Sequence, residues 1–245
     1  QIGDGDLPDF HGKQVVVIGG GNVAMDVTRS SIRLGADKVT CVYRRRQEDM
    51  TALPEEVEGA VAEGAELLTL QAPVRMESGP DGHVTALWTQ PQIIGQADKN
   101  GRPSPNGADQ PELRVPADII IVAIGQGIET RYFEDAGIPI KRGVIQAADW
   151  SAVENAPGVF AGGDCVTGPA TVIRAIAAGK VAARNIDAYL GCSHKLACEA
   201  SAPPAPPNDR TPKGRVELME RPARERKCDF PAVERGMGRE GAGPE

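Results

Sequence analysis

The architecture of this chain follows from one segment, residues 14–26, with the sequence QVVVIGGGNVAMD. Its first part, Val15 to Ile18, is apolar and β-branched without alternation, which is typical of a parallel strand covered on both faces. The glycines that follow fit the dinucleotide-binding pattern Gly-x-Gly-x-x-Ala, in which Ala24 is the final small residue. These small residues allow a tight turn, let the backbone approach a pyrophosphate and let helix and strand pack closely. The helix that begins here would offer free N–H groups and its positive dipole end to phosphates.

The residues after the glycines complete a β-α-β unit, which is the context that this glycine pattern requires. We expect the helix to carry Val23, Val27 and Leu34 on its apolar face and to end at Gly35. A second parallel strand is predicted over residues 39–43, VTCVY.

Three arginines, Arg44 to Arg46, follow the second strand directly. A dinucleotide without a 2′-phosphate is usually bound at this position by an acidic residue, and the nearest acids here, Glu48 and Asp49, lie further on. Guanidinium groups bind phosphate in a bidentate manner, so the arginines indicate NADP(H) rather than NAD(H). The alternative is a solvated basic run at the end of a strand.

The middle of the chain has weaker patterns. A helix is predicted over residues 55–66, and two strands over residues 67–76 and 83–90. Residues 91–116 are rich in Pro, Gly, Asn and Asp, so they are expected to form an excursion rather than core. A buried strand is then predicted over residues 117–127, ADIIIVAIGQG.

Two glycine-containing turns in the later part of the chain are candidates for ligand contact. Gly125 ends the apolar strand just described, at the edge of the sheet where ligands bind. Gly163 and Asp164 follow a short strand predicted over residues 158–161. A proline then precedes a helix predicted over residues 172–190. This second glycine turn and helix start indicate a second nucleotide-like ligand.

The gross composition excludes several classes of function. The 245 residues carry a formal net charge of −7, which argues against a nucleic-acid partner. No apolar run is long enough to cross a membrane, and the polar N-terminal residues predict no signal peptide. Five irregularly spaced cysteines, with no C-x-x-C pair, argue against a disulfide framework and favour a reducing, cytoplasmic location.

Four segments in this order resemble the small (beta) subunit of NADPH-dependent glutamate synthase and related flavoprotein subunits of NAD(P)H oxidoreductases. They are VVVIGGGNVAMD, VYRRR, ADIIIVAIGQG and GVFAGGDCVTGPATVIRAIAAGK. The match covers roughly residues 10–192, and such an ordered series is more specific than a single glycine pattern. The segment RVELMERPARERKCDF also resembles the C-terminal extension of that family.

The resemblance implies an α/β flavoprotein fold with two dinucleotide-binding domains, in which an NADP domain is inserted into an FAD domain. Residues 12–127 would form the Rossmann-like NAD(P)H-binding domain. Residues 128–191 would form the C-terminal half of the FAD-binding domain. Residues 1–11 would be a linker, and residues 192–245 a proline-rich and charged tail.

The resemblance also implies two cofactor sites. NADPH would lie against the first glycine turn, and two arginines would bind its 2′-phosphate. FAD would lie against the second glycine turn, with the flavin ring facing the start of the following helix. That arrangement is physically sensible because a helix N-terminus stabilises negative charge on a reduced flavin. The predicted cofactor-binding residues are Gly19, Gly20, Gly21, Asn22, Val23, Ala24, Arg44, Arg45, Gly125, Gly163, Asp164, Ala170, Thr171 and Val172.

The first FAD half and the iron–sulfur cysteines of such proteins are absent from this sequence. The chain is therefore expected to be a fragment, or a subunit that needs the missing half, and alone it should bind NADPH better than FAD. The predicted function is electron transfer from NADPH through FAD to an iron–sulfur partner or a large subunit of the glutamate synthase type. The flavin does the chemistry, so no catalytic residue and no metal ligand is assigned.

Two alternatives stay open. An enzyme of the thioredoxin-reductase type shares the fold but requires a C-x-x-C pair, which this sequence lacks. A non-catalytic NADP-binding or interaction module would keep the glycines and arginines without the flavin. Cys165 lies beside the predicted FAD motif, but it has no second cysteine at disulfide spacing, and we expect a packed thiol.

Overall fold

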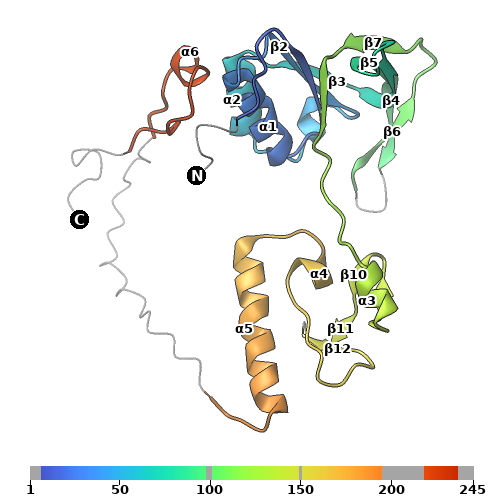
Figure 1. Ribbon diagram of the computed structural model, residues 1–245, viewed down its shortest axis with the longest axis vertical. Coiled ribbons are helices and arrows are strands. Elements are labelled where there is room, and N and C mark those ends of the chain that lie inside the picture. The colour runs from blue at the N-terminus through green and yellow to red at the C-terminus, as the bar shows by residue number, and fades with distance from the viewer. Residues whose placement is uncertain (1–6, 98–100, 149–150, 195–217, 237–245) are drawn as a thin grey trace. The chain divides into compact units, whose positions relative to one another are not determined.

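The computed structural model describes residues 7–97, 101–148, 151–194 and 218–236 (Figure 1). The chain divides into two compact units. The first unit comprises residues 1–125 together with 213–245, and the second comprises residues 126–212. No helix in the described ranges has both the length and the apolar character needed to cross a membrane.

The first unit is built on a four-stranded parallel sheet in the order β3-β2-β1-β8. These strands are β1 (Gln14–Ile18), β2 (Lys38–Tyr43), β3 (Glu66–Thr69) and β8 (Ile119–Val122). Side chains of β1 pack into two apolar clusters, Val15 and Val17 into one and Val16 and Ile18 into the other. The predicted parallel strand covered on both faces is confirmed.

Two helices flank the sheet, α1 (Asn22–Arg33) and α2 (Pro54–Glu63), and they pack against each other. The buried face of α1 consists of Ala24, Met25, Thr28 and Ser31. The apolar face predicted for this helix was therefore wrong at Val23, which is 65% exposed. Its side chain lies in the first turn, beside the open glycine turn, where no strand covers it. Ala24 and Met25 are fully buried instead, and the small Ala24 suits a close approach of helix and strand at the glycine turn.

An antiparallel arm extends from the first unit. It consists of β4 (Gln71–Ser78), β5 (Val84–Ala97), β6 (Pro103–Gly107) and β7 (Leu113–Pro116). The long β5 pairs with all three of the others. The prediction that residues 91–116 form an excursion without core was thus wrong in part, because two strands lie there and Val115 is buried. The prolines of β6 are tolerated since this strand lies at the edge of the sheet.

Glu77 joins three strands of this arm. Its carboxylate accepts hydrogen bonds from Arg114 Nη2 at 2.6 Å, Trp88 Nε1 at 2.7 Å and Thr85 Oγ1 at 3.1 Å. The bonds from Arg114 and then Trp88 lower the pKa of Glu77 to about 2. The ionised form is therefore favoured in the folded chain.

The Glu77 contacts predict a pH-dependent stability. A depressed folded-state pKa stabilises the fold above the unfolded pKa, here 4.5, and this stabilisation is lost as the pH falls towards 2. We expect Glu77→Gln to be less stable than the wild type at about pH 7, with a difference that shrinks by about pH 3. Urea denaturation at both pH values measures the free energy of unfolding of each variant. Glu58→Gln, at an exposed position of α2, serves as control. A difference that does not change with pH would contradict the prediction.

The second unit contains α3 (Arg131–Asp135), four two-residue strands and the helices α4 (Asp164–Thr167) and α5 (Val172–Tyr189). The strands are β9 (Ile140–Lys141), β10 (Val144–Ile145), β11 (Ala147–Ala148) and β12 (Ala152–Val153). The helix predicted over residues 172–190 is confirmed. The strand predicted over residues 158–161 is wrong, because only an isolated bridge between Phe160 and Ala152 forms there.

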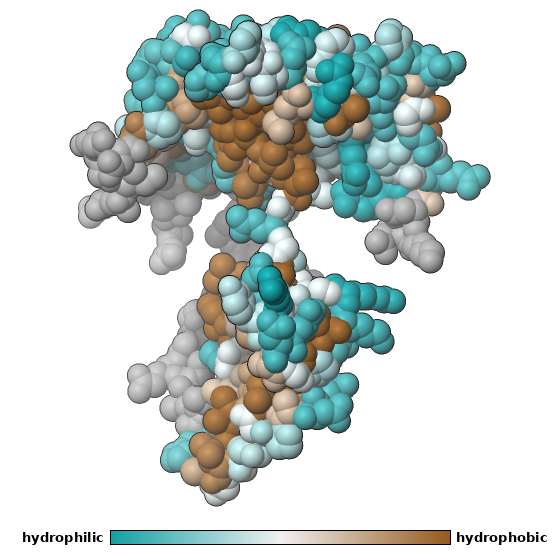
Figure 2. Space-filling view, turned by 45° about the vertical axis from the view of Figure 1, so that its right-hand side comes forward, coloured by the Kyte–Doolittle hydropathy of each residue, from teal (hydrophilic) through white to brown (hydrophobic). Residues whose placement is uncertain are grey.

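The long helix α5 of the second unit is largely exposed. Ala178 is its one buried residue, while Val172 is 75% and Ile173 is 79% exposed. Figure 2 shows hydrophobic side chains, in brown, at the surface of this unit. An apolar helix face of this kind normally packs against other protein.

Residues 192–194 of the predicted tail belong to the second unit, and residues 218–236 of it belong to the first. Its short helix α6 (Ala223–Arg226) packs against α2. The rest of the tail, including the proline-rich stretch, lies outside the described residues.

Glu63, at the end of α2, is fully buried among three arginines. Its Oε1 lies 2.8 Å from Nη2 of Arg29, 3.1 Å from Nη2 of Arg33 and 2.9 Å from Nε of Arg226. Burial disfavours the charge on Arg29, but hydrogen bonds to Glu63 and Glu56 raise the pKa of its guanidinium. This buried cluster joins α1, α2 and α6.

Candidate functional site

A cavity of about 640 Å³ opens at the carboxyl ends of β1, β2 and β8. Parallel sheets commonly bind ligands at this edge, and the volume suits a small-molecule site. The predicted residues that line it are Gly19, Gly20, Gly21, Asn22, Val23, Arg44, Arg45 and Gly125. Ala24 is fully buried beneath them. The structure therefore brings all the residues predicted for the first site together, and their contact with a cofactor stays a prediction.

The glycine turn is shaped by close approaches that exclude a side chain. A Cβ on Gly19 would lie 2.4 Å from the carbonyl oxygen of Ala123 and 3.0 Å from Cβ of Ala24. A Cβ on Gly20 would lie 2.5 Å from the ring of Tyr43. The first two glycines thus pack against neighbouring strands, while Gly21 has open space towards the cavity apart from Thr51 Oγ1 at 3.4 Å.

The start of α1 leaves its first N–H groups available to a ligand. Gly21 is its N-cap, no side chain caps the helix in the described structure, and its first turn contains no acidic residue. Such a helix start attracts anions. The Asn22 side chain is used elsewhere, since its Oδ1 accepts a hydrogen bond from the Leu53 N–H at 2.8 Å. The carbonyl of Gly20 accepts the N–H groups of Thr51 and Ala52 at 2.9 and 3.1 Å, which fixes the neighbouring loop.

Two of the three arginines after β2 face the cavity. Arg44 is exposed and lines it. Arg45 is 8% exposed, and its Nε donates to the carbonyl of Pro103 at 2.7 Å. Arg46 does not line the cavity, because it forms ion pairs with Asp49 at 2.9 Å and with Glu48 at 2.8 Å. The environments of the three side chains agree with the choice of Arg44 and Arg45 as candidates.

Sequence reasoning missed other residues of the cavity wall. Thr51 comes from the loop before α2, and Ala72 and Pro73 come from β4. Arg102 comes from the turn between β5 and β6, inside the stretch expected to be an excursion. The pairing of β5 with β4 and β6 brings Ala72, Pro73 and Arg102 to the cavity, and no local sequence pattern predicts such pairing. Thr51 is held there by the hydrogen bond from its N–H to the carbonyl of Gly20.

The residues predicted for the second site also lie together. Gly163, Asp164, Ala170, Thr171 and Val172 line one hollow of about 430 Å³ in the second unit. Asp164 Oδ1 accepts the N–H of Ala170 at 3.2 Å, and Thr171 Oγ1 caps α5 by accepting the N–H of Arg174 at 3.4 Å. The carboxylate therefore holds the loop before α5, and the role of these residues towards FAD stays a prediction.

Neither described cysteine near these turns has the surroundings of a reactive thiol. Burial raises the pKa of Cys41 to about 11. The thiol of Cys165 is half-buried and donates to the carbonyl of Gly162 at 3.2 Å. A thiolate is needed for nucleophilic or redox chemistry, so burial makes Cys41 inert. The contact of Cys165 agrees with the packed thiol expected at that position.

The family of the chain is decided by a match to a family model. The model for "Pyridine nucleotide-disulphide oxidoreductase" matches residues 2–179. The chain belongs to this family. The predicted fold class is thereby confirmed, and two solved structures of the same fold agree with it.

Those structures are similar in fold alone. Thioredoxin reductase of T. acidophilum matches with a TM-score of 0.58 at 21% identity. The matched region covers 74% of this chain and 53% of the thioredoxin reductase chain. Mycobacterium tuberculosis FprA in complex with NADPH matches with a TM-score of 0.59 at 18% identity. The matched region covers 75% of this chain and 54% of the FprA chain.

Curated relatives in this family confirm the resemblance drawn from the sequence. A putative glutamate synthase [NADPH] small chain of Cereibacter sphaeroides is 37% identical over 80% of this chain and 48% of its own length. The NADP(+)-dependent formate dehydrogenase subunit beta of Moorella thermoacetica is 39% identical over 75% of this chain and 26% of its own. The chain thus spans less than half the length of these relatives.

Proposed function

We propose that this chain is the NADPH-binding part, with a portion of the FAD-binding part, of an oxidoreductase that passes electrons from NADPH to a flavin. One observation carries the proposal. The glycine turn, the open start of α1 and Arg44 with Arg45 meet around a single cavity at one edge of the parallel sheet. Membership of a pyridine nucleotide oxidoreductase family supports it.

The first cavity suits the charges of NADPH. The N–H groups at the start of α1 would bind the pyrophosphate, and the close-packed glycines leave room for it. Arg44 would donate to the 2′-phosphate, and Arg45 would do so with the nitrogens not used by Pro103. These side chains bind and orient the cofactor, and none has to accept or donate a proton.

The second hollow suits part of FAD. Its open floor of Gly163 and Ala170 lets a ligand approach the backbone, and Thr171 begins a helix of 18 residues whose dipole favours negative charge. A bound flavin would supply hydride acceptance and single-electron donation. The hollow of about 430 Å³ holds only a portion of such a ligand, which agrees with an incomplete FAD site.

Partner protein is part of this proposal. The exposed apolar face of α5 would be covered by the missing half of the FAD-binding domain. The relatives are named as a subunit and a small chain, which supports a partner subunit. In this proposal the electron acceptor is an iron–sulfur subunit or a large subunit of the glutamate synthase type. The cytoplasmic location predicted from the cysteines belongs to the same proposal.

The proposal is tested with the purified chain, free FAD and NADPH under anaerobic conditions. We expect NADPH to bind, as measured by nicotinamide fluorescence, because its cavity lies wholly within the first unit. We also expect NADPH to bleach the visible absorbance of FAD supplied in excess, while NADPH and FAD without the chain serve as control.

The outcomes separate this proposal from a non-catalytic module. That second candidate would keep the cavity of the first unit without using a flavin. NADPH binding with flavin that stays oxidised at every FAD concentration would support the module. A chain that binds no NADPH would contradict both candidates.

A further inference from the structure

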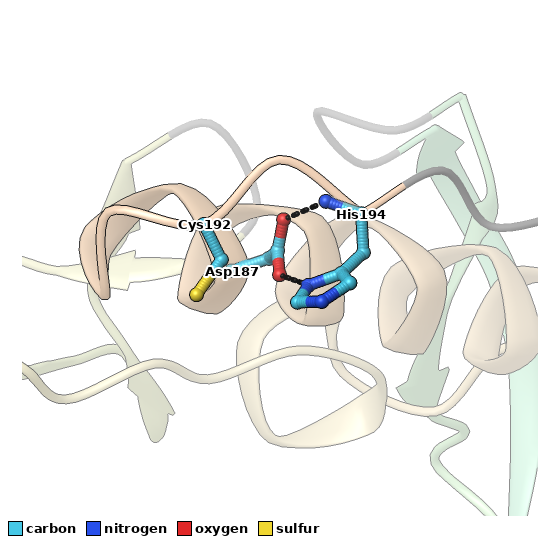
Figure 3. A group of neighbouring side chains, drawn as sticks. All are labelled: Asp187, Cys192 and His194. Carbon is cyan, nitrogen blue, oxygen red and sulfur yellow. Dashed lines mark hydrogen bonds and ion pairs between the residues drawn. The ribbon is translucent and has the colours of Figure 1, made fainter.

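Three side chains of the kinds that bind metal ions meet at the C-terminal end of α5 (Figure 3). They are Asp187 in the last turn of the helix, and Cys192 and His194 just after it. One carboxylate oxygen, the thiol sulfur and one imidazole nitrogen all lie within 4.8 Å of one another. Asp187 is half-buried and the other two are exposed, so solvent reaches the cluster.

The backbone brings these residues together by a defined helix ending. Gly191 has a left-handed φ of +74°, and its N–H donates to the carbonyl of Ala188 at 3.0 Å. The N–H of Cys192 donates to the carbonyl of Asp187 at 2.9 Å. These two bonds form a Schellman motif, which turns the chain back across the end of the helix. The positions of Asp187 and Cys192 therefore depend on the fold rather than on chance contact of mobile side chains.

A pair of hydrogen bonds fixes His194 in the same place. Its backbone N–H donates to Asp187 Oδ2 at 2.8 Å, and its Nδ1 lies 2.5 Å from Asp187 Oδ1. Figure 3 shows the carboxylate between the imidazole ring and the residue that carries the sulfur. One carboxylate thus orients both the backbone and the ring of His194, which lowers the ordering cost of binding an ion.

The chemistry of the three groups selects one class of metal. A thiolate, an imidazole and a carboxylate together are typical ligands of Zn²⁺ and similar divalent transition metals, whereas Mg²⁺ and Ca²⁺ prefer oxygen. The C-terminal end of a helix carries partial negative charge, and the last turn of α5 contains no basic residue. Both the ligands and the surroundings favour a cation.

We propose that Asp187, Cys192 and His194 form a surface site for a divalent transition metal of the zinc class, separate from the proposed cofactor sites. The ion replaces the hydrogen between Asp187 and His194; the neutral imidazole then carries its proton on Nε2, and any further proton of this pair and the thiol proton of Cys192 pass to solvent. The exposed His194 side chain can rotate outward to admit the ion. With three protein ligands, a water molecule completes a tetrahedral shell.

The chain contains a matched control for this cluster. Asp9 and His11 form the same kind of pair, with Nδ1 of His11 2.5 Å from Oδ1 of Asp9, and both side chains are exposed. No cysteine lies close enough to complete a ligand group with them, and the α5 cluster is the only such group among the described residues. Cys228 is likewise an exposed free cysteine outside the cluster.

Cobalt(II) titration of the full, reduced chain tests the proposal, since cobalt substitutes for zinc and a cobalt–thiolate bond absorbs in the near ultraviolet. We expect one equivalent to bind with this absorption band. Cys192→Ser should abolish the band, and His194→Ala should weaken cobalt binding by about tenfold or more. His11→Ala and Cys228→Ser should behave as the wild type.

A second series carries Cys198→Ser in every variant, because Cys198 lies four positions beyond His194 and outside the described residues. The three-residue site predicts that Cys198→Ser alone keeps the cobalt–thiolate band, and that adding Cys192→Ser to it abolishes the band. Circular dichroism of Cys192→Ser and His194→Ala verifies that the exposed substitutions leave the helices intact. The proposal is overturned if no band forms, if the band survives Cys192→Ser, or if it is lost with Cys198→Ser alone.

Discussion

Replacing Arg44 by glutamine is expected to weaken NADPH binding by about tenfold or more and to leave NADH binding unchanged. A hydrogen bond to a charged group contributes about 1.5–3 kcal/mol, and NADH lacks the 2′-phosphate that would receive it. Arg44 is exposed and lines the cavity, so its substitution leaves the core unchanged. Fluorescence titration of both dinucleotides measures the two dissociation constants.

Arg46→Gln is the matched control for this experiment. Arg46 has the same chemistry and is the next residue but one, yet it pairs with Asp49 and Glu48 away from the cavity. It should therefore retain wild-type affinity for NADPH. Equal weakening of NADPH and NADH by Arg44→Gln would show that this arginine does not bind the 2′-phosphate. Arg45→Gln should weaken NADPH binding too. This substitution also removes the hydrogen bond from Arg45 to the carbonyl of Pro103, so its effect combines the lost phosphate contact with a change at the β5–β6 turn.

Glu63→Ala is expected to lower the free energy of unfolding by about 3–5 kcal/mol, the largest change in stability that we predict for a single substitution. Removing the carboxylate leaves the guanidinium groups of Arg29, Arg33 and Arg226 close together with their shared buried counter-charge gone. Like charges in a poorly solvated place destabilise the fold strongly. Urea denaturation of the first unit, monitored by Trp88 fluorescence, measures the loss.

Glu58→Ala provides the comparison on the same helix. Glu58 is exposed on α2, so its replacement should change the free energy of unfolding by no more than about 0.5 kcal/mol. A loss below about 1 kcal/mol for Glu63→Ala would mean that water or movement of α6 compensates the arginines, and it would contradict the structural role given to this cluster.

The parts of the site that the sequence predicts are those encoded within a few residues. The glycine turn, the start of α1 and the arginines after β2 each depend on a spacing of under ten residues, and the structure places them around one cavity. The same holds for Gly163 and Asp164 before α5. Strand, turn and helix preferences act locally, so a local pattern is sufficient for them.

The parts that the sequence does not predict depend on pairing between distant segments. Arg102 reaches the cavity because β5 pairs with both β4 and β6, and the prolines of β6 conceal that strand in the sequence. The burial of Arg45 likewise follows from Pro103, and the burial of Glu63 follows from Arg226 near the other end of the chain. Tertiary packing overrides local preference at these positions.

The hydrogen bonds around the carbonyl of Gly20 have a kinetic consequence. The carbonyl of Gly20 accepts the N–H groups of Thr51 and Ala52, and Asn22 Oδ1 accepts the N–H of Leu53, so contacts within the protein fix this loop. A dinucleotide entering the cavity therefore meets a wall that is preformed on this side, and it does not have to order that loop. Association should then be limited by diffusion and by the attraction of the arginines for phosphate, so that differences in affinity between dinucleotides lie mainly in how fast each one leaves.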